Sequence, residues 1–170
     1  MSAQVIVSPL SELEATWREH RPSHVIGMLS PTSVHPALED HDATRRLVLA
    51  FHDINMPREG FTAPDLAMVS SLLEFARGWD GKAPLLIHCW AGISRSTAAA
   101  FIVACVRAPQ TAEDDIADQL RTASPMATPN RLMVEIADGL LGREGRMLEA
   151  IDRIGRGADA LEGIVFELHV

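Results

Sequence analysis

Short apolar runs alternate with segments of helical spacing along most of this chain. Runs of strand length lie at residues 5–7, 25–29, 47–51 and 85–89. Between them, residues 10–18 and 63–79 carry apolar side chains at steps of three and four positions, which is the spacing of one helix face. Strands alternating with helices predict an α/β fold, with a central, partly parallel sheet of about four or five strands flanked by helices.

The second half of the chain continues the helical pattern. Residues 96–108 are apolar on nearly every side, which predicts a helix buried within the domain. The pattern predicts further helices at residues 111–122 and 130–138 and from Glu144 onward. The tail, residues 164–170, alternates weakly and is interpreted as an edge strand.

Composition narrows the class of protein. A chain of 170 residues with 47% hydrophobic content has the size of one domain, and no linker divides it, so residues 1–170 are interpreted as a single domain. A net charge of -8 argues against broad binding to nucleic acid or to a membrane surface. The N-terminal stretch lacks a signal-peptide pattern, and no window reaches the ~18 apolar residues of a membrane span. We therefore expect a cytoplasmic protein.

Residues 85–101, "LLIHCWAGISRSTAAAF", predict a strand, a tight loop and the start of a buried helix. The backbone N–H groups of such a loop can point at one anion, and the helix start adds its positive end. Gly92 suits the sharp turn, and Arg95 offers a planar fork of donors for phosphate oxygens. The phosphate-binding residues expected here are Trp90, Ala91, Gly92, Ile93, Ser94 and Arg95.

The thiol of Cys89 lies at the floor of this predicted cradle. The donors that would hold a phosphate also favour thiolate over thiol, and the thiolate is the reactive form of cysteine. We therefore interpret Cys89 as a nucleophile directed at phosphorus. The second cysteine, Cys105, falls within the predicted buried helix, where a core residue is favoured over a redox partner of Cys89.

The stretch "HCWAGISRS", residues 88–96, resembles the signature of the cysteine-based protein tyrosine phosphatase superfamily, and its interior is most similar to the dual-specificity branch. "HVIGMLS" at residues 24–30 resembles an early strand of these phosphatases, and "TPNRLMVEIADGLL" at residues 128–141 resembles the start of a late helix. The resemblance covers residues 24–141. Residues 142–170 resemble nothing in that family, and their role stays open.

The resemblance implies a role for each matching position. Cys89 would form a cysteinyl-phosphate intermediate, and Arg95 would bind the transferring phosphoryl group. Ser96 would donate a hydrogen bond to the sulfur, although Ser96 and Thr97 are also candidates for plain helix caps. His88 would fix the loop and help to keep the thiolate stable. The mechanism that the family implies uses no metal and no cofactor, and its substrate is a phosphorylated protein or a small phosphoester.

The same mechanism needs an acid to protonate the leaving oxygen. In the family this acid is an aspartate on a loop that follows an earlier strand. Asp53 directly follows the apolar run at 47–51 and is the candidate that we prefer. Asp65 follows Pro64 at a predicted helix start, where a capping role is more plausible, and Glu59 is farther from the strand end.

Two alternatives concern other polar positions. The cluster at residues 35–42 could hold a metal through His35, Asp40 and His41, but a solvated loop is the preferred interpretation. Trp90 could stack on a substrate ring or seal the loop from outside.

The sequence also bears on the substrate. It contains no tyrosine, so the tyrosine-containing motif of the strictly phosphotyrosine-specific branch is missing and a shallow cleft is expected. The loop between Cys89 and Arg95 lacks the lysines of the lipid-directed branch, which disfavours inositol lipids. Arg45, Arg46 and Arg58 could face a second negative charge or simply lie in solvent. The alternatives are a phospho-binding pseudophosphatase, or the same chemistry on a nucleotide, an RNA 5′ end or an inositol phosphate.

Overall fold

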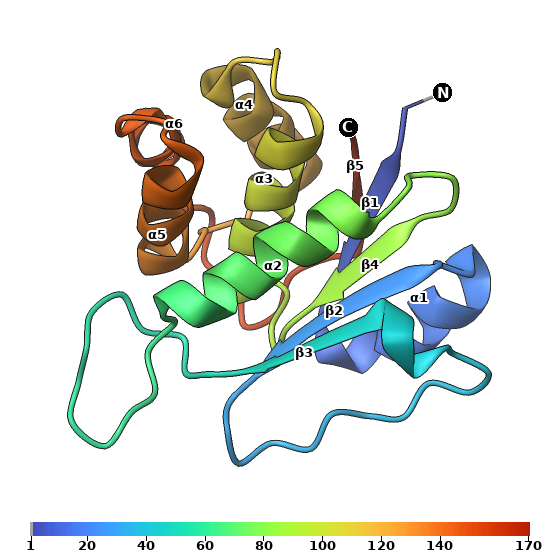
Figure 1. Cartoon of the computed structure of the whole chain (residues 1–170). Helices are drawn as coiled ribbons and strands as arrows, with labels where there is room; N and C mark the ends of the chain where they lie inside the picture. The colour runs from blue at the N-terminus through green and yellow to red at the C-terminus, as the bar shows by residue number, and fades with distance from the viewer. Residues whose placement is uncertain (1) are drawn as a thin grey trace.

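A five-stranded mixed sheet forms the centre of the molecule in the computed structural model, which describes residues 2–170 (Figure 1). The strands follow the order β3-β2-β4-β1-β5 across the sheet. Their bounds are β1 Gln4–Ser8, β2 His24–Leu29, β3 Arg46–Ala50, β4 Leu85–His88 and β5 Phe166–His169. The first four strands run parallel, and β5 pairs antiparallel with β1 at the edge. The predicted α/β class, the partly parallel sheet and the edge strand in the tail are confirmed.

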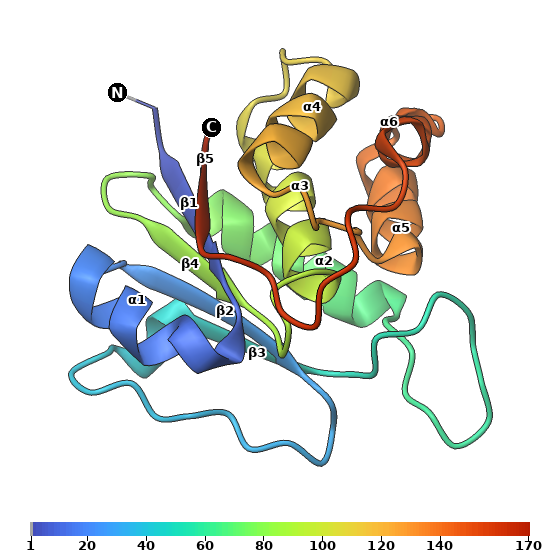
Figure 2. The ribbon, with the colours of Figure 1, turned by 180° about the vertical axis from the view of Figure 1, so that it is seen from behind.

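Helices cover both faces of this sheet unequally. Helix α1 lies on one face, and α2 to α6 lie on the other, as the two opposite views show (Figures 1 and 2). Helices and 3-10 turns are η1 Leu10–Glu12, α1 Leu13–His20, η2 Ala43–Arg45, α2 Leu66–Gly78, α3 Arg95–Arg107, α4 Glu113–Ala123, α5 Arg131–Leu141 and α6 Arg146–Ile154. Each helix expected from the sequence is present, with bounds that differ by a few residues.

The alternation of side chains along the strands separates two cores. Ile26 and Met28 of β2 point into the larger core, which includes the buried faces of α2 and α3. Their neighbour Val25 points the other way and packs with Leu13 and Trp17 of α1 in a smaller core. Helix α3 is buried from its first residue to Cys105, which explains why its sequence is apolar on every side.

The start of α2 differs from the prediction. The helix begins at Leu66 because the carboxylate of Asp65 accepts a hydrogen bond from the backbone N–H of Met68 at 2.8 Å. Asp65 therefore caps this helix, as its position after Pro64 suggested.

The start of α3 also differs. It begins at Arg95, so the capping position belongs to Ser94, whose hydroxyl makes no cap bond. The interpretation of Ser96 and Thr97 as helix caps is wrong, because both lie inside the first turn. The Thr97 hydroxyl instead donates back to the carbonyl of Ile93 at 2.6 Å.

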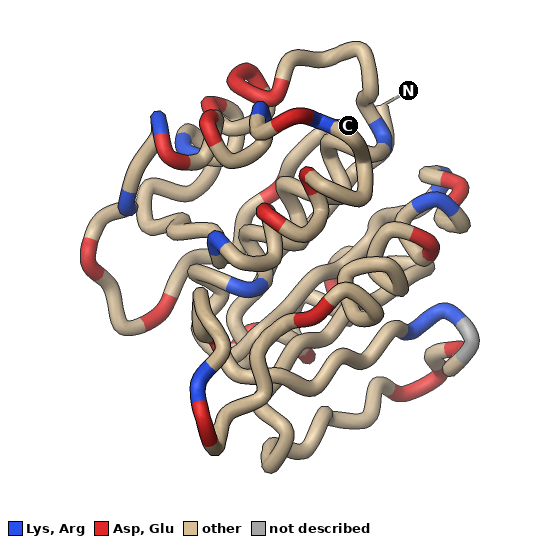
Figure 3. Tube along the Cα trace, turned by 60° about the vertical axis from the view of Figure 1, so that its left-hand side comes forward, with Lys and Arg blue, Asp and Glu red and all other residues tan. Residues whose placement is uncertain are grey.

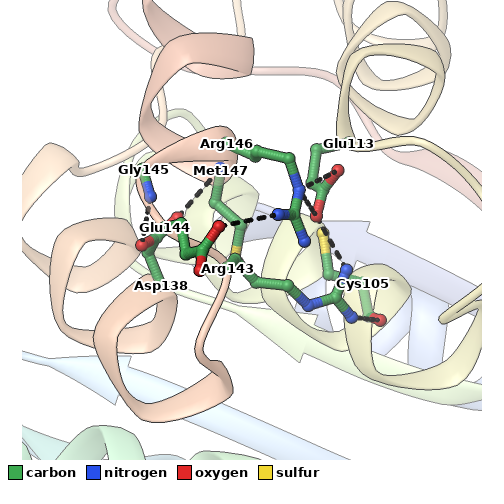
Figure 4. A network of polar contacts seen from close by, with 8 residues as sticks. All are labelled: Cys105, Glu113, Asp138, Arg143, Glu144, Gly145, Arg146 and Met147. Atoms are coloured by element: carbon green, nitrogen blue, oxygen red, sulfur yellow. Dashed lines mark hydrogen bonds and ion pairs between the residues drawn. The ribbon is translucent and has the colours of Figure 1, made fainter.

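An ionic network around the buried Glu113 joins α3, α4 and the start of α6 (Figure 4). Glu113 is only 7% exposed and accepts hydrogen bonds from Arg143 at 2.8 Å and from Arg146 at 3.3 Å. Arg143 also donates to the carbonyl of Cys105 at 2.9 Å, and Asp138 accepts from two backbone N–H groups at the start of α6.

Burial raises the pKa of Cys105 to about 12. Cys105 is therefore an inert core thiol, as expected.

Parallel topology brings the functional loops to one edge of the sheet. Strands β3 and β4 end at the same side, since Gly27 of β2 pairs with both Val48 and His88. The loops that follow these strands therefore begin close together.

Lysine and arginine positions are scattered singly or in short pairs over the molecule (Figure 3). Among residues 2–170, no helix is long and apolar enough to cross a membrane.

Candidate active site

Cys89 follows β4 directly and is 2% exposed. Its Sγ accepts a hydrogen bond from the backbone N–H of Gly92 at 3.2 Å and lies 3.1 Å from the hydroxyl oxygen of Ser96. The sulfur therefore lies between a turn of the loop and the first turn of α3. Both neighbours are groups that can stabilise negative charge on sulfur.

The loop from Cys89 to Ser94 depends on a close approach at Gly92. This residue has a φ of 70°, in the left-handed region that glycine occupies at little cost. A Cβ here would also lie 2.8 Å from the backbone nitrogen of Pro9, at the end of β1. The turn can therefore form only where the side chain is absent, and this turn aims the Gly92 N–H at the sulfur.

Arg95 is held at the opposite end of the loop. Its side chain is nearly buried, and Nη1 donates to the carbonyl of Phe51 at 2.8 Å. The guanidinium also lies over the Phe51 ring, 5.9 Å from its centroid, while Nε is buried without a partner among residues 2–170. Phe51 orients the guanidinium and leaves donors free, and a phosphate oxygen would satisfy them.

The carboxylate of Asp53 contacts the same loop. Oδ1 accepts from the hydroxyl of Ser94 at 2.7 Å and from Nδ2 of Asn130 at 2.8 Å. The structure therefore brings Asp53 beside the cradle, on the loop after β3 where the sequence placed it. Asp65 is engaged as the cap of α2, and Glu59 is exposed in the protruding part of that loop.

Asn130 was not identified from the sequence as a site residue. The "Pro-Asn" start of the late helix was recognised, and Asn130 does cap α5 by accepting from Met133 N at 3.0 Å. Its amide nitrogen also donates two further hydrogen bonds, one to Asp53 and one to the carbonyl of Ile54 at 3.1 Å. A local pattern could indicate only the cap, since the contact with Asp53 spans 77 positions.

His88 is fully buried beside the cradle. Burial is the main cause that lowers its pKa to about 4, and the charges of Arg46 and His35 act in the same direction. A weak contact with the Cys89 backbone only partly offsets these effects. The His35 ring lies edge-on at 6.1 Å between centroids. His88 is therefore neutral at neutral pH.

The structure also shows the surroundings of Trp90 and of the three arginines that could face a second negative charge on the substrate. Trp90 is 64% exposed, so most of its ring surface is open to solvent. Arg58 lies over the ring of Phe61, and Arg45 lies 3.9 Å from Asp42. Burial lowers the pKa of Arg46, and the Arg46 charge in turn lowers the pKa values of His35 and His88.

The predicted metal alternative receives no support from the cluster geometry. Within residues 2–170, no group of three His, Cys, Asp or Glu side chains is arranged to hold a metal ion. The ring of His41 instead packs edge-on against Trp17, and one ring nitrogen lies 3.3 Å from the carbonyl of Arg45.

Comparisons with known proteins give a match in structure and none in sequence. No protein-family model matches the chain, and no curated protein matches it. DUSP15 matches at 16% identity with a TM-score of 0.61, covering 88% of this chain and 89% of that one. The human tyrosine phosphatase-like serine/threonine/tyrosine-interacting protein matches at 18% identity and a TM-score of 0.64, with 82% and 92% covered. PTPMT1 in complex with PI(5)P matches at 13% identity with a TM-score of 0.58, covering 82% of this chain and 94% of that one.

These likenesses cover nearly the whole of each chain. At such low identity they establish the fold alone. The resemblance noted from residues 88–96 is thereby confirmed at the level of the fold.

Proposed function

We propose that this chain, which has the fold of the dual-specificity-phosphatase-like cysteine phosphatases, hydrolyses phosphomonoesters through a cysteinyl-phosphate intermediate. The observation that carries the proposal is the placement of Cys89, Arg95, Ser96 and Asp53 around one loop. The sulfur lies within 3.2 Å of an N–H donor and 3.1 Å of a hydroxyl, and the carboxylate is tied to the same loop through Ser94.

In the first step, Sγ of Cys89 attacks phosphorus, an S–P bond forms and the bond to the leaving oxygen breaks. Arg95 and the loop N–H groups of residues 90–95 bind the non-bridging oxygens, whose charge must be stabilised in the transition state. Asp53 donates its proton to the leaving oxygen, which departs as an alcohol or phenol.

In the second step, water attacks phosphorus and the S–P bond breaks. Asp53, now ionised, accepts the proton of the attacking water. The sulfur leaves as a thiolate, and the hydroxyl of Ser96 donates a hydrogen bond to it. Inorganic phosphate is released, and every group returns to its starting protonation state.

The preferred substrate is a phosphorylated protein. The exposed ring of Trp90 beside the loop offers a flat apolar surface to a phosphorylated side chain. PTPMT1 was solved with PI(5)P, so an inositol lipid belongs among the substrates tested. The residues between Cys89 and Arg95 carry no basic side chain, and we therefore expect weak activity on that lipid.

Turnover of a small aryl phosphate by the parent and by Cys89→Ser tests the reaction. The parent should release phosphate, vanadate should inhibit it and a chelator should not. Cys89→Ser should fold and bind phosphoester without turnover, because a serine hydroxyl stays protonated at neutral pH. Loss of activity with EDTA would contradict a metal-free mechanism.

A panel of phosphopeptides, PI(5)P, inositol phosphates and 5′-phosphorylated RNA then ranks substrate classes by kcat/KM. Highest turnover on phosphopeptides would support a protein substrate. A chain that binds phosphopeptides but turns over no member of the panel, the aryl phosphate included, would instead be a pseudophosphatase.

A further inference from the structure

The peptide carbonyls of the cradle loop are bound by backbone donors from outside the loop. Three donors come from three distant segments: Leu10 N to Trp90 O at 3.0 Å, Gly163 N to Ala91 O at 2.7 Å, and Thr128 N to Ile93 O at 2.9 Å. The second of these belongs to the tail that resembles nothing in the phosphatase family. Figure 2 shows this tail leaving α6, passing the end of β4 where α3 begins, and rising into β5.

The carbonyl that the tail binds belongs to the peptide between Ala91 and Gly92. Because a trans peptide is planar, its C=O and N–H point in opposite directions. When Gly163 holds the Ala91 carbonyl at 2.7 Å on the outer side, the Gly92 N–H must point inward. That same N–H donates to Sγ of Cys89 at 3.2 Å. One peptide plane therefore links the tail to the proposed nucleophile.

The tail is held in place by contacts on both sides of Gly163. Toward α6, Ala158 N donates to Pro125 O at 2.9 Å, and Gly157 N donates to the hydroxyl of Thr128 at 3.0 Å. Next to Gly163, the hydroxyl of Ser11 donates to the carboxylate of Glu162. Beyond it, β5 pairs with β1 in the sheet. The donor at residue 163 is therefore fixed relative to the sheet and is not a loose end.

Residue 163 is a glycine at a point of close backbone approach. A Cβ there would lie 2.7 Å from the carbonyl oxygen of Gly92 and 3.3 Å from that of Ala91. Its φ is not positive, so alanine would meet no backbone strain of its own. A substitution at this position would therefore act by forcing the tail and the cradle loop apart.

We infer that Gly163 is a positioning residue for Cys89, acting through the 91–92 peptide plane, and that the C-terminal segment 155–165 is part of the active site. The catalytic part of this inference rests on the proposed function. The effect on the thiol does not, because it concerns only a hydrogen bond to sulfur.

Gly163→Ala tests the inference with three measurements. The first is the rate of alkylation of Cys89 by iodoacetamide against pH, which requires no turnover; Cys105, whose pKa is raised to about 12 by burial, should stay unlabelled. The midpoint should move to higher pH, because the sulfur loses a donor that favours its ionised form. The second is kcat on an aryl phosphate, which should fall by about 10- to 100-fold if the loop shifts by a fraction of an ångström to an ångström. The third is the melting temperature, which should fall, because a Cβ at residue 163 forces backbone atoms of the tail and the cradle loop apart.

Gly139→Ala is the matched control, because a Cβ at this helical glycine meets no atom within 4 Å. It should leave the alkylation profile and kcat as in the parent. Ser11→Ala removes the side-chain contact with Glu162 without adding bulk, and should shift the alkylation midpoint in the same direction by less. It keeps the test valid if Gly163→Ala does not fold.

The outcomes separate the two proposals. A parent that turns over substrate, with Gly163→Ala and Ser11→Ala leaving the alkylation profile unchanged, would overturn the inference and leave the phosphatase proposal standing. A lower melting temperature with an unchanged profile would assign the tail a purely structural role and would also overturn it. A shifted profile in a chain whose parent shows no turnover would support the positioning role and contradict the proposed function.

Discussion

Nδ2 of Asn130 donates a hydrogen bond to Oδ1 of Asp53 at 2.8 Å across 77 positions of sequence. Asn130 also precedes the first residue of α5 and caps it. The position of the proposed acid is therefore tied to the end of a helix, and not only to its own loop. Together with the Ser94 hydroxyl, this contact restricts the carboxylate to one side of the cradle.

Asp53→Asn should lower the turnover of an alkyl phosphate by about 10² or more, the usual scale for a lost general acid. The amide has no proton to donate, so the fall of kcat/KM at high pH should also flatten. The loss should be smaller for an aryl phosphate with a very acidic leaving group, which departs without help. Comparing kcat/KM against pH on both substrates checks this, with Asp65→Asn and Glu59→Gln as controls. If either control loses the high-pH limb while Asp53→Asn keeps it, the acid has been misassigned.

Asn130→Ser separates the two tasks of the asparagine. Both variants lose the amide hydrogen bonds to Asp53 and Ile54, but serine retains a helix cap, so Asn130→Ala should lower the free energy of unfolding by ~1 kcal/mol more than Asn130→Ser. Both variants lose the contact with Asp53, so both should lower kcat by a similar factor. Chemical denaturation and turnover of the same preparations check this. A normal kcat in Asn130→Ser would mean that the asparagine serves only as a cap.

Arg95→Lys should lower kcat by orders of magnitude although it keeps the charge. An ammonium cannot contact both the Phe51 carbonyl and two phosphate oxygens in one plane. Vanadate should inhibit this variant at much higher concentration than the parent. Turnover and vanadate inhibition close to those of the parent would show that another group binds the phosphoryl oxygens.

Acid should destabilise the protein through His88. Its pKa is lowered from 6.5 to about 4, so the unfolded chain binds this proton more readily than the folded one. The stabilisation is therefore complete above pH 6.5 and is lost as pH falls from there through about 4. Between about pH 7 and about pH 5, this group alone should account for a loss of roughly 2 kcal/mol. His35, whose pKa is also lowered, chiefly by burial, acts in the same direction.

His88→Gln should reduce this dependence on pH, and the exposed His169→Gln should leave it unchanged. Urea unfolding of the three proteins at both pH values checks the expectation. An equal loss of stability in the parent and in His88→Gln would mean that other groups cause the acid sensitivity.

The Glu113 network should contribute to folding without a direct effect on the site. Glu113→Ala leaves the guanidinium of Arg143 without its carboxylate and should lower the free energy of unfolding by about 3–5 kcal/mol. Glu144→Ala removes an exposed pair with Arg146 in the same network and should cost less than about 1 kcal/mol. Denaturant titration of both variants measures their free energies of unfolding. Equal losses in the two variants would show that burial does not govern the strength of these ion pairs.

Much of the fold could be predicted because its signals are local. Apolar runs such as residues 25–29 indicate strands whatever they pair with, and the spacing of residues 88–96 encodes a loop whose chemistry lies within nine positions. The contacts from Asn130 and Gly163 could not be predicted, because each depends on the register of elements far apart in sequence. A glycine in a tail has no signal that distinguishes a close approach from a turn.

The ends of the sheet have a consequence for synthesis. Ala3 and Val170 exchange both backbone hydrogen bonds at 2.8 Å, so two segments far apart in the sequence pair at this edge of the sheet. A ribosome releases the chain in sequence order, and β4 with Cys89 emerges long before β5 can dock beside β1. On the inference that Gly163 orients the 91–92 peptide, a chain in which the tail has not yet docked lacks the contact that directs the Gly92 N–H at Cys89. The complete cradle would then form only after β5 has paired with β1.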